Sequence, residues 1–228
     1  MITILFSAIL ASILHVISGP DHLAAVTPLA ISSQRKGWKV GLFWGIGHLL
    51  GMLLIGFLFL LFKDVIPIEA ISAYSEQLVA IVLILVGLWA FYRIFKEKKT
   101  LNLPHTHKDG QTHIHSFETE KDMHSHKKDI KQDVISSLGI GFIHGLAGVA
   151  HFILLLPVLA FETNLESIQY ILGFAIGTVI AMTSYGLILG NIASYTKKAN
   201  DPIFFKGIRF GGGLFAIVIG IYWLYLTF

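Results

Sequence analysis

Six long apolar stretches constrain this 228-residue chain more than any other feature of its sequence. They cover residues 2–31, 38–62, 77–95, 134–161, 168–192 and 207–227. A helix rises 1.5 Å per residue, so about twenty apolar residues cross the roughly 30 Å hydrocarbon core of a bilayer. With 54% hydrophobic and 14% charged residues, the chain also lies outside the usual composition of soluble domains. These features predict an all-α integral membrane protein with six transmembrane helices, the first retained rather than cleaved as a signal peptide.

The basic residues are distributed unevenly between the segments that connect these stretches. Of the 17 Lys and Arg residues, Lys63 alone falls on one side of the alternating topology, and the others fall on the opposite side. Because cytoplasmic loops accumulate Lys and Arg, the second side is expected to be cytoplasmic. The sequence therefore predicts a multi-pass protein of the cell (plasma) membrane with both termini outside the cytoplasm and a cytoplasmic linker at 96–133.

Two pairs of stretches in opposite halves of the chain resemble each other. "HVISGPDHLAAVTP" (15–28) and "HGLAGVAHFILLLP" (144–157) share the pattern H-x3-G-x2-H-x5-P, and "GLFWG" (41–45) resembles "GFAIG" (173–177). With three spans per half, the second half enters the membrane from the opposite side, an arrangement typical of transporters. We therefore expect two inverted three-helix repeats, 1–95 and 134–228, each with a broken first helix and joined by the linker 96–133.

The first motif predicts a helix break between its two histidines. In an unbroken helix, His15 and His22 would lie about 10.5 Å apart along the axis, too far to share one metal ion at bond lengths of about 2.1 Å. Gly19-Pro20 supplies the break, since proline removes a backbone donor and disfavours helical backbone in the preceding residue. Asp21 would then begin a second half-helix as its N-cap. In the second half, Gly148 alone would have to permit the kink. Otherwise His144 and His151 would serve different sites along a path.

The predicted spans contain histidines and one aspartate, ionisable side chains of the types that form metal sites. Membrane spans rarely carry such groups, which usually face the bundle interior and mark function. Imidazole and carboxylate suit divalent Ni, Co, Zn or Fe, and the absence of cysteine excludes thiolate ligands, disulfides and dithiol redox chemistry. His48 is either a ligand or a histidine that packs beside the ligands. The candidate metal residues are His15, Asp21, His22, His48, His144 and His151.

The expected linker contains the other six histidines as three H-x-H pairs. This composition favours metal chelation on the cytoplasmic side over a merely solvated linker. Binding there would weaken in acid, because unperturbed imidazoles protonate near pH 6.5. The pairs are His105 and His107, His113 and His115, and His124 and His126.

The motifs also resemble those of a known family. "HVISGPDHLAAVTPLA", followed by "GHLLG" and "GFIHGLAGVAH", is similar to the nickel/cobalt transporter family, especially its six-span branch of urease-accessory-type nickel permeases and His-rich efflux proteins. Members carry H-x4-D-H in the first span, whereas this chain has H-x5-D-H from His15 to His22 with a Gly-Pro insertion. The resemblance implies that His15, Asp21 and His22 bind transported metal, without giving the direction of transport.

These observations predict a permease for a divalent transition metal, Ni or Co foremost, rather than an enzyme. No P-loop of the form GxxxxGK[ST] is present, so we expect an ion gradient, with protons as the natural exchange ion, or a separate energising subunit. The expected partners are the lipid bilayer and the metal substrate, with no nucleic acid and no prosthetic group.

Two other functions fit the same residues. Pairs of histidines could ligate haem in a membrane redox protein. Alternatively, they could relay protons in an anion or organic-solute exporter. An intramembrane metalloprotease is disfavoured, because the sequence contains no HExxH motif.

Overall fold

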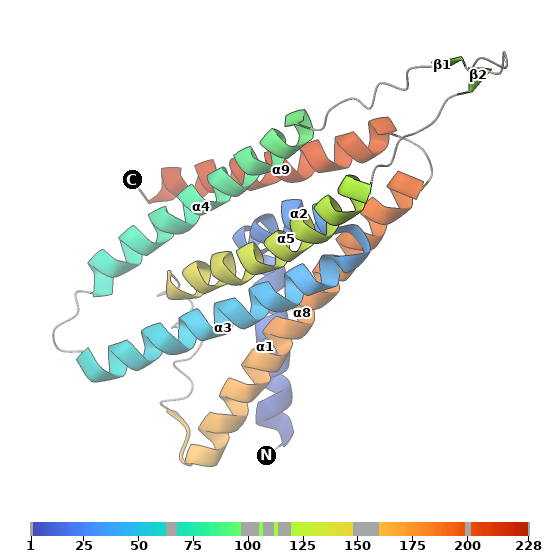
Figure 1. The fold of residues 1–228 in the computed structure, drawn as a ribbon. Coiled ribbons are helices and arrows are strands. Elements are labelled where there is room, and N and C mark those ends of the chain that lie inside the picture. The colour runs from blue at the N-terminus through green and yellow to red at the C-terminus, as the bar shows by residue number, and fades with distance from the viewer. Residues whose placement is uncertain are drawn as a thin grey trace.

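A computed structural model describes residues 2–62, 68–96, 105–106, 112–113, 120–147, 160–198 and 202–227. Helices dominate these residues, and the two strands are a two-residue antiparallel pair (Figure 1). The all-α membrane class predicted from the sequence is confirmed. The elements are α1 (Ile2–Ser18), α2 (Pro20–Ser33), the 3₁₀ turn η1 (Gln34–Lys36), α3 (Gly37–Phe62), α4 (Ile68–Lys96), β1 (His105–Thr106), β2 (Thr112–His113), α5 (Glu120–Leu146), α8 (Asn164–Lys198) and α9 (Pro202–Leu226).

The described helices account for four to six membrane-crossing segments. Four stretches are long and apolar enough by themselves: Pro20–Leu58, Glu76–Lys96, Asn164–Lys197 and Ile203–Leu226. Thr3–Ser18 is apolar but shorter, because the first expected span is divided into α1 and α2. Helix α5 begins at Glu120, inside the range expected to be linker. The second half therefore starts its helical structure earlier than hydropathy alone predicts.

Helices of the two halves pack against each other in pairs. Helix α1 packs on α8, α3 on α5, and α4 on α9, and α2 contacts α3, α5, α8 and α9 near the centre. Figure 1 shows α3 beside α5 and α4 beside α9. An inverted repeat predicts this arrangement: the first helix of each half packs on the second helix of the other half, and the two third helices pack on each other. The symmetry itself stays a prediction.

Glycines allow the close approach of α3 and α5. A Cβ atom on Gly47 would meet the carbonyl oxygen of Leu138, and one on Gly141 would meet the carbonyl oxygen of Trp44. Small residues at such contacts bring helix backbones together where lipid removes most of the hydrophobic gain from association. The helices that carry His48 and His144 are therefore held at short range.

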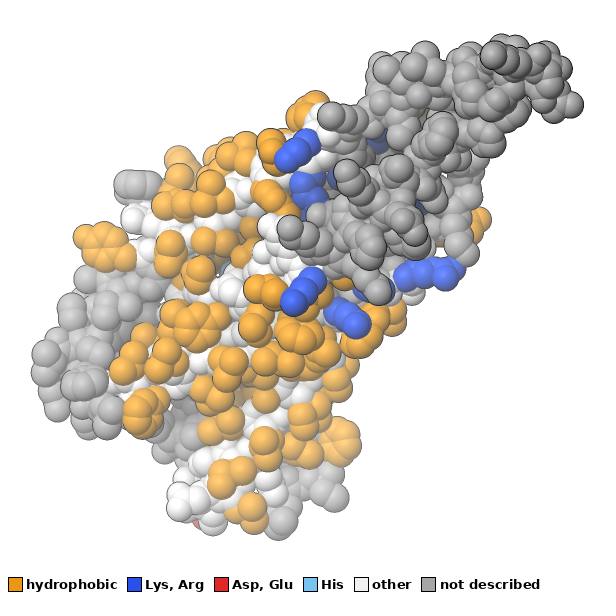
Figure 2. Space-filling model, in the orientation of Figure 1, with side chains coloured by type: hydrophobic (Ala, Val, Ile, Leu, Met, Phe, Trp, Pro, Cys, Tyr) orange, Lys and Arg blue, Asp and Glu red, His pale blue; other side chains and the backbone are white. Residues whose placement is uncertain are grey.

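Basic side chains gather at one end of the bundle, here called the basic end (Figure 2). The carbonyl oxygen of Gln34 in η1 approaches Gly190 of α8, and Phe91 of α4 stacks on Phe210 of α9. Because Gly212 of α9 also lies against Ile31 of α2, the corresponding ends of these four helices lie near one another. Large apolar side chains are exposed over the rest of the visible face, as expected for a surface in lipid. The basic end carries Arg35, Lys36, Lys39, Arg93, Lys96, Lys197, Lys206 and Arg209. Its cytoplasmic location stays a prediction.

Gly141→Ala should destabilise the protein, because its Cβ would collide with the α3 backbone and force the helices apart. Overpacking of this kind costs about 1–3 kcal/mol, or several degrees in melting temperature for a chain of this size. Gly139→Ala, on the same helix, is the matched control, since none of the described residues outside its own stretch of helix lies within 4 Å of its Cβ position. Thermal unfolding of both variants in detergent tests the contact, and equal melting temperatures would contradict it.

Candidate metal-binding site

The first expected span is broken where the sequence predicts. Helix α1 ends at Ser18, Gly19 has extended backbone angles (φ −89°, ψ 97°), and Pro20 starts α2. The change of direction brings the ring centroids of His15 and His22 to 4.7 Å. Two imidazoles that would lie about two turns apart in a straight helix therefore face each other.

The role expected for Asp21 as N-cap is wrong. Gly19 occupies the N-cap position, no side chain caps the helix, and Asp21 lies in the first turn of α2. Proline fits the first helical position because its missing N–H needs no partner there. The carboxylate still benefits from the positive end of the helix dipole, and it remains free to bond other side chains.

The Asp21 carboxylate joins the two halves of the chain. Its Oδ1 lies 3.1 Å from Nδ1 of His22 on α2, and its Oδ2 lies 2.9 Å from Nε2 of His144 on α5. All three residues are buried. Burying a carboxylate in a membrane interior costs free energy unless the carboxylate is paired. Each ring therefore lowers the cost of burying the carboxylate, and the carboxylate lowers the cost of burying each ring.

The described residues contain two groups of three side chains able to hold a metal ion. Asp21, His22 and His144 form one group, and His15, His22 and His48 form the other. Within each group the donor atoms lie within 4.8 Å of one another. Ligand atoms about 2.1 Å from one ion are separated by roughly 3–4 Å, so each group needs only a small inward movement. His22 belongs to both groups and is the centre of the cluster.

Trp44 is part of the cluster, and the sequence analysis missed it. Its indole ring stacks on His48 at 4.9 Å with an interplanar angle of 12°, and lies 5.3 Å from His144 and 5.5 Å from His22. The side chain is fully buried. Its position one helical turn before His48 was the available signal, since residues four apart share a helix face. Trp44 therefore forms one wall of the cluster and restrains the His48 ring.

A second buried carboxylate lies at the basic end. By the span limits predicted from the sequence, Asp133 falls in the linker 96–133, which leaves Asp21 as the only acid in the predicted spans. Asp133 instead lies within α5, its side chain is 1% exposed, and it accepts hydrogen bonds from Arg93 at 2.6 Å and Ser33 at 3.0 Å. Hydropathy could not find it, because the polar sequence before residue 134 hides the early start of the helix.

Several predicted site residues lie outside this cluster. His151, His107 and His115, and the kink expected at Gly148, fall outside the described residues. The register of the strand pair places His105 opposite His113, and His124 and His126 lie on α5. Chelation by these linker histidines stays a prediction.

The fold and the cluster define a helical membrane protein with a buried His/Asp centre made by both halves of its chain. The chain belongs to the family described as the cytochrome c biogenesis protein transmembrane region, whose profile matches residues 4–225. No solved structure matches it.

Three curated relatives are similar over most of the chain. Two are the Arabidopsis thaliana chloroplast proteins FOR GROWTH AND FERTILITY 1 and 2, at 33% identity over 96% and 34% identity over 97% of the chain. The chain spans 58% and 56% of their lengths. The third is urease accessory protein UreH of Bacillus sp. (strain TB-90), 34% identical over 90% of this chain and 84% of its own. The predicted relation to urease-accessory-type proteins is supported by this relative, and membership of the nickel/cobalt transporter family stays a prediction.

Gly19→Ala should weaken metal binding without removing a ligand. A Cβ at this position would meet Nδ1 of His22, with Oδ1 of Asp21 3.0 Å away, so the shared imidazole must move. Loss of ligand orientation typically costs 10–100-fold in metal affinity. Calorimetric titration with Co²⁺ should show a loss in this range for Gly19→Ala and none for Gly139→Ala. Unchanged affinity in both would show that the tight helix break does not set the position of His22.

Proposed function

We propose that this protein moves a divalent transition-metal cation, Ni²⁺ or Co²⁺ foremost, across the membrane through the cluster centred on His22. One observation carries the proposal: two groups of three metal-binding side chains share His22, and one of these groups joins both halves of the chain through His144. A cation that exchanges His144 and Asp21 for His15 and His48 would move without leaving its shared ligand. Overlapping positions of this kind suit transport better than permanent storage.

The ligand chemistry supports a borderline divalent ion. The cluster offers imidazole nitrogens and one carboxylate, and the sequence has no cysteine for a soft-metal site. Zn²⁺ and Fe²⁺ are compatible with the same donors. Similarity to a protein named for urease accessory function, together with the first-span motif, favours nickel among them.

We propose protons as the exchanged ion. A histidine binds metal only when its ligating nitrogen is unprotonated, so arrival of a cation releases protons and departure allows them to return. The described helices bury Asp21, His22, His48 and His144 and half-bury His15, in an interior where an uncompensated double charge is costly. Exchange of protons for metal would limit that charge during each transport cycle.

A haem-binding redox function fits the geometry less well. The family description concerns cytochrome c biogenesis, but the imidazole centroids in the cluster lie only 4.7–5.6 Å apart, and the Trp44 ring covers one side. These separations leave no room for a planar macrocycle between two axial histidines. A Soret band in the purified protein would reverse this conclusion.

His22→Ala should lower Ni²⁺ and Co²⁺ flux into proteoliposomes at least tenfold, because His22 belongs to both groups of ligands. Thr178→Ala is the matched control, since Thr178 is equally buried and, in the described part of the chain, its hydroxyl donates to the carbonyl oxygen of Phe174 on its own helix. Equal flux in wild type and His22→Ala for every metal tested would overturn the proposal. Intact export of an anion or organic solute without calorimetric metal binding would support the proton-relay alternative instead.

Metal affinity should fall as pH is lowered, because protons compete with the cation for the imidazole nitrogens of the cluster. Stability of the metal complex is therefore present at neutral pH and lost in acid. Calorimetric titration with Co²⁺ from neutral pH far into the acid range measures this dependence. Affinity that is independent of pH would contradict ligation by histidine.

A further inference from the structure

The buried carboxylate of Asp133 and the metal cluster lie on one face of α5. Asp133, Ser137 and His144 are separated by four and seven residues, so their side chains follow a single stripe along the helix. All three are buried: Asp133 is 1%, Ser137 0% and His144 2% exposed. The stripe spans about 16 Å at 1.5 Å per residue. It connects the cluster to the basic end through the protein interior.

Helix α2 follows the same course in the opposite direction. Asp21 meets His144 at one end of the seam between α2 and α5, and Ser33 meets Asp133 at the other, with bonds of 2.9 Å and 3.0 Å. Each end of the seam is therefore marked by one buried carboxylate. A cation leaving the cluster along this seam would reach Asp133 next.

Arg93 closes the far end of this seam. Its guanidinium donates to Asp133 Oδ1 at 2.6 Å and lies 4.7 Å from the centre of the Trp89 ring. Arg93 belongs to α4 in the first half and Asp133 to α5 in the second. The ion pair therefore ties the two halves together at the basic end.

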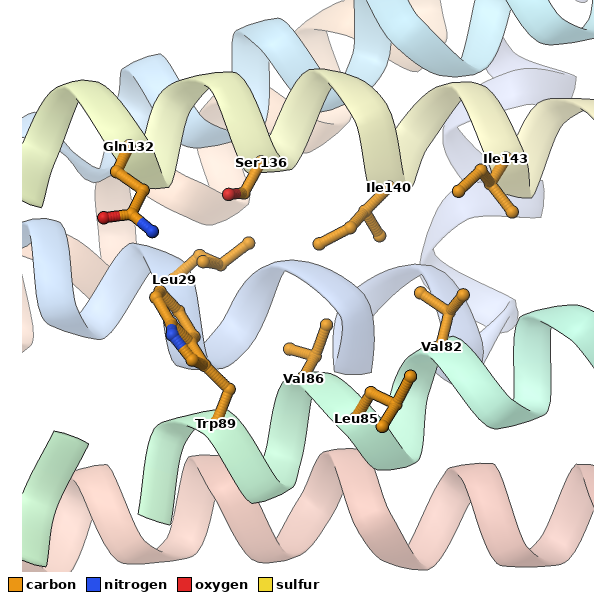
Figure 3. Close-up of a pocket in the computed structure, with 9 residues that line it drawn as sticks. All are labelled: Leu29, Val82, Leu85, Val86, Trp89, Gln132, Ser136, Ile140 and Ile143. Carbon is orange, nitrogen blue, oxygen red and sulfur yellow. The ribbon is translucent and has the colours of Figure 1, made fainter. Parts of the chain in front are cut away.

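Away from this pair, α4 and α5 are separated by a cavity. The cavity has a volume of about 310 Å³ and lies between α2, α4 and α5. Figure 3 shows Trp89 and Gln132 lining one end and Val82 and Ile143 the other. Space beside the ion pair leaves α4 room to move relative to α5 once the pair opens.

We propose that Arg93, Asp133 and Ser33 form the gate at the basic end of the cation route, and that Asp133 exchanges Arg93 for the cation as it passes. The proposal rests on the transport function proposed above. Asp133 suits this role because a carboxylate binds either a guanidinium or a divalent cation, and Ser33 holds its second oxygen in place during the exchange. Release of Arg93 opens the seam only when a competing positive charge is present.

Cysteine labelling tests the gate directly, because the chain has no native cysteine. Ser137→Cys places one thiol between the gate and the cluster. In nanodiscs, a charged, membrane-impermeant maleimide should label Arg93→Gln/Ser137→Cys about tenfold faster than Ser137→Cys, since loss of one buried charge-assisted contact opens the gate. Arg35→Gln/Ser137→Cys removes an exposed charge from the same end and should label at the Ser137→Cys rate. Equal labelling of all three would overturn the proposal.

Arg93→Lys/Ser137→Cys gives a second measurement in case the glutamine variant does not fold. Lysine keeps the positive charge but loses the planar fork of arginine, so the thiol should react at an intermediate rate. Size-exclusion chromatography and Co²⁺ titration of the central cluster verify that each variant is intact. The gate would be contradicted if the lysine variant and an intact glutamine variant both react with the maleimide at the rate of Ser137→Cys alone.

Flux measurements test the carboxylate. Asp133→Asn should keep Co²⁺ affinity at the central cluster but lower Co²⁺ flux about tenfold, and Glu162→Gln, an exposed acid, should change neither. Unchanged flux in Asp133→Asn would overturn its role in the route. If the wild type carries no metal flux, the proposed function itself is refuted. If the wild type carries flux, Asp133→Asn carries the same flux and the labelling rates do not change, only the gate is refuted.

Discussion

The structure depends on one carboxylate held between two imidazoles from opposite halves of the chain. Asp21 bonds His22 on α2 and His144 on α5, and all three groups lie among membrane helices. Each of these groups would be costly to bury without a partner. The break at Gly19-Pro20 turns α2 so that the carboxylate reaches α5, and glycines on α3 and α5 hold the surrounding helices close enough to exclude lipid. Local backbone chemistry and long-range packing therefore serve the same small polar centre.

The sequence predicts those parts of the structure that follow from local rules. Hydropathy gives the membrane class, Gly19-Pro20 gives the break, and the rarity of ionisable side chains in spans singles out the histidines that the structure brings together. It does not predict contacts decided by tertiary packing. Asp133 is buried by helices from elsewhere in the chain, and Trp44 becomes part of the cluster only because α3 packs on α5. Asp21 was expected to cap α2 because it follows the break, but proline at the first helical position moves the cap back to Gly19.

The packing also suggests a different alignment of the two halves from the one that the glycine motifs suggest. Sequence similarity aligns Gly41 with Gly173, yet a Cβ on Gly41 would meet α8 and one on Gly173 would meet α1. A better match is Gly47 with Gly177, whose Cβ positions meet the carbonyl oxygens of Leu138 and Ile9. Those two contact residues are 129 apart, as are His15 and His144. In an inverted repeat, equivalent positions contact equivalent helices of the opposite half. Sequence similarity alone does not contain this information.

On this alignment, the two halves contribute different side chains to the cluster and to the ends of the bundle. His48 then corresponds to Thr178, and Trp44 to Phe174, which lies 6.1 Å from His15 just as Trp44 lies near His144. The counterpart of Asp133 is Ile4, so the buried carboxylate at the basic end has an apolar equivalent at the other. Two identical halves would present the same barrier to a cation in both directions. The first half has Ile4 in place of the carboxylate, and the second half has Thr178 in place of the imidazole. In the transport cycle proposed above, the two sides would therefore open by different means, one by exchange of an ion pair and the other by separation of apolar surfaces.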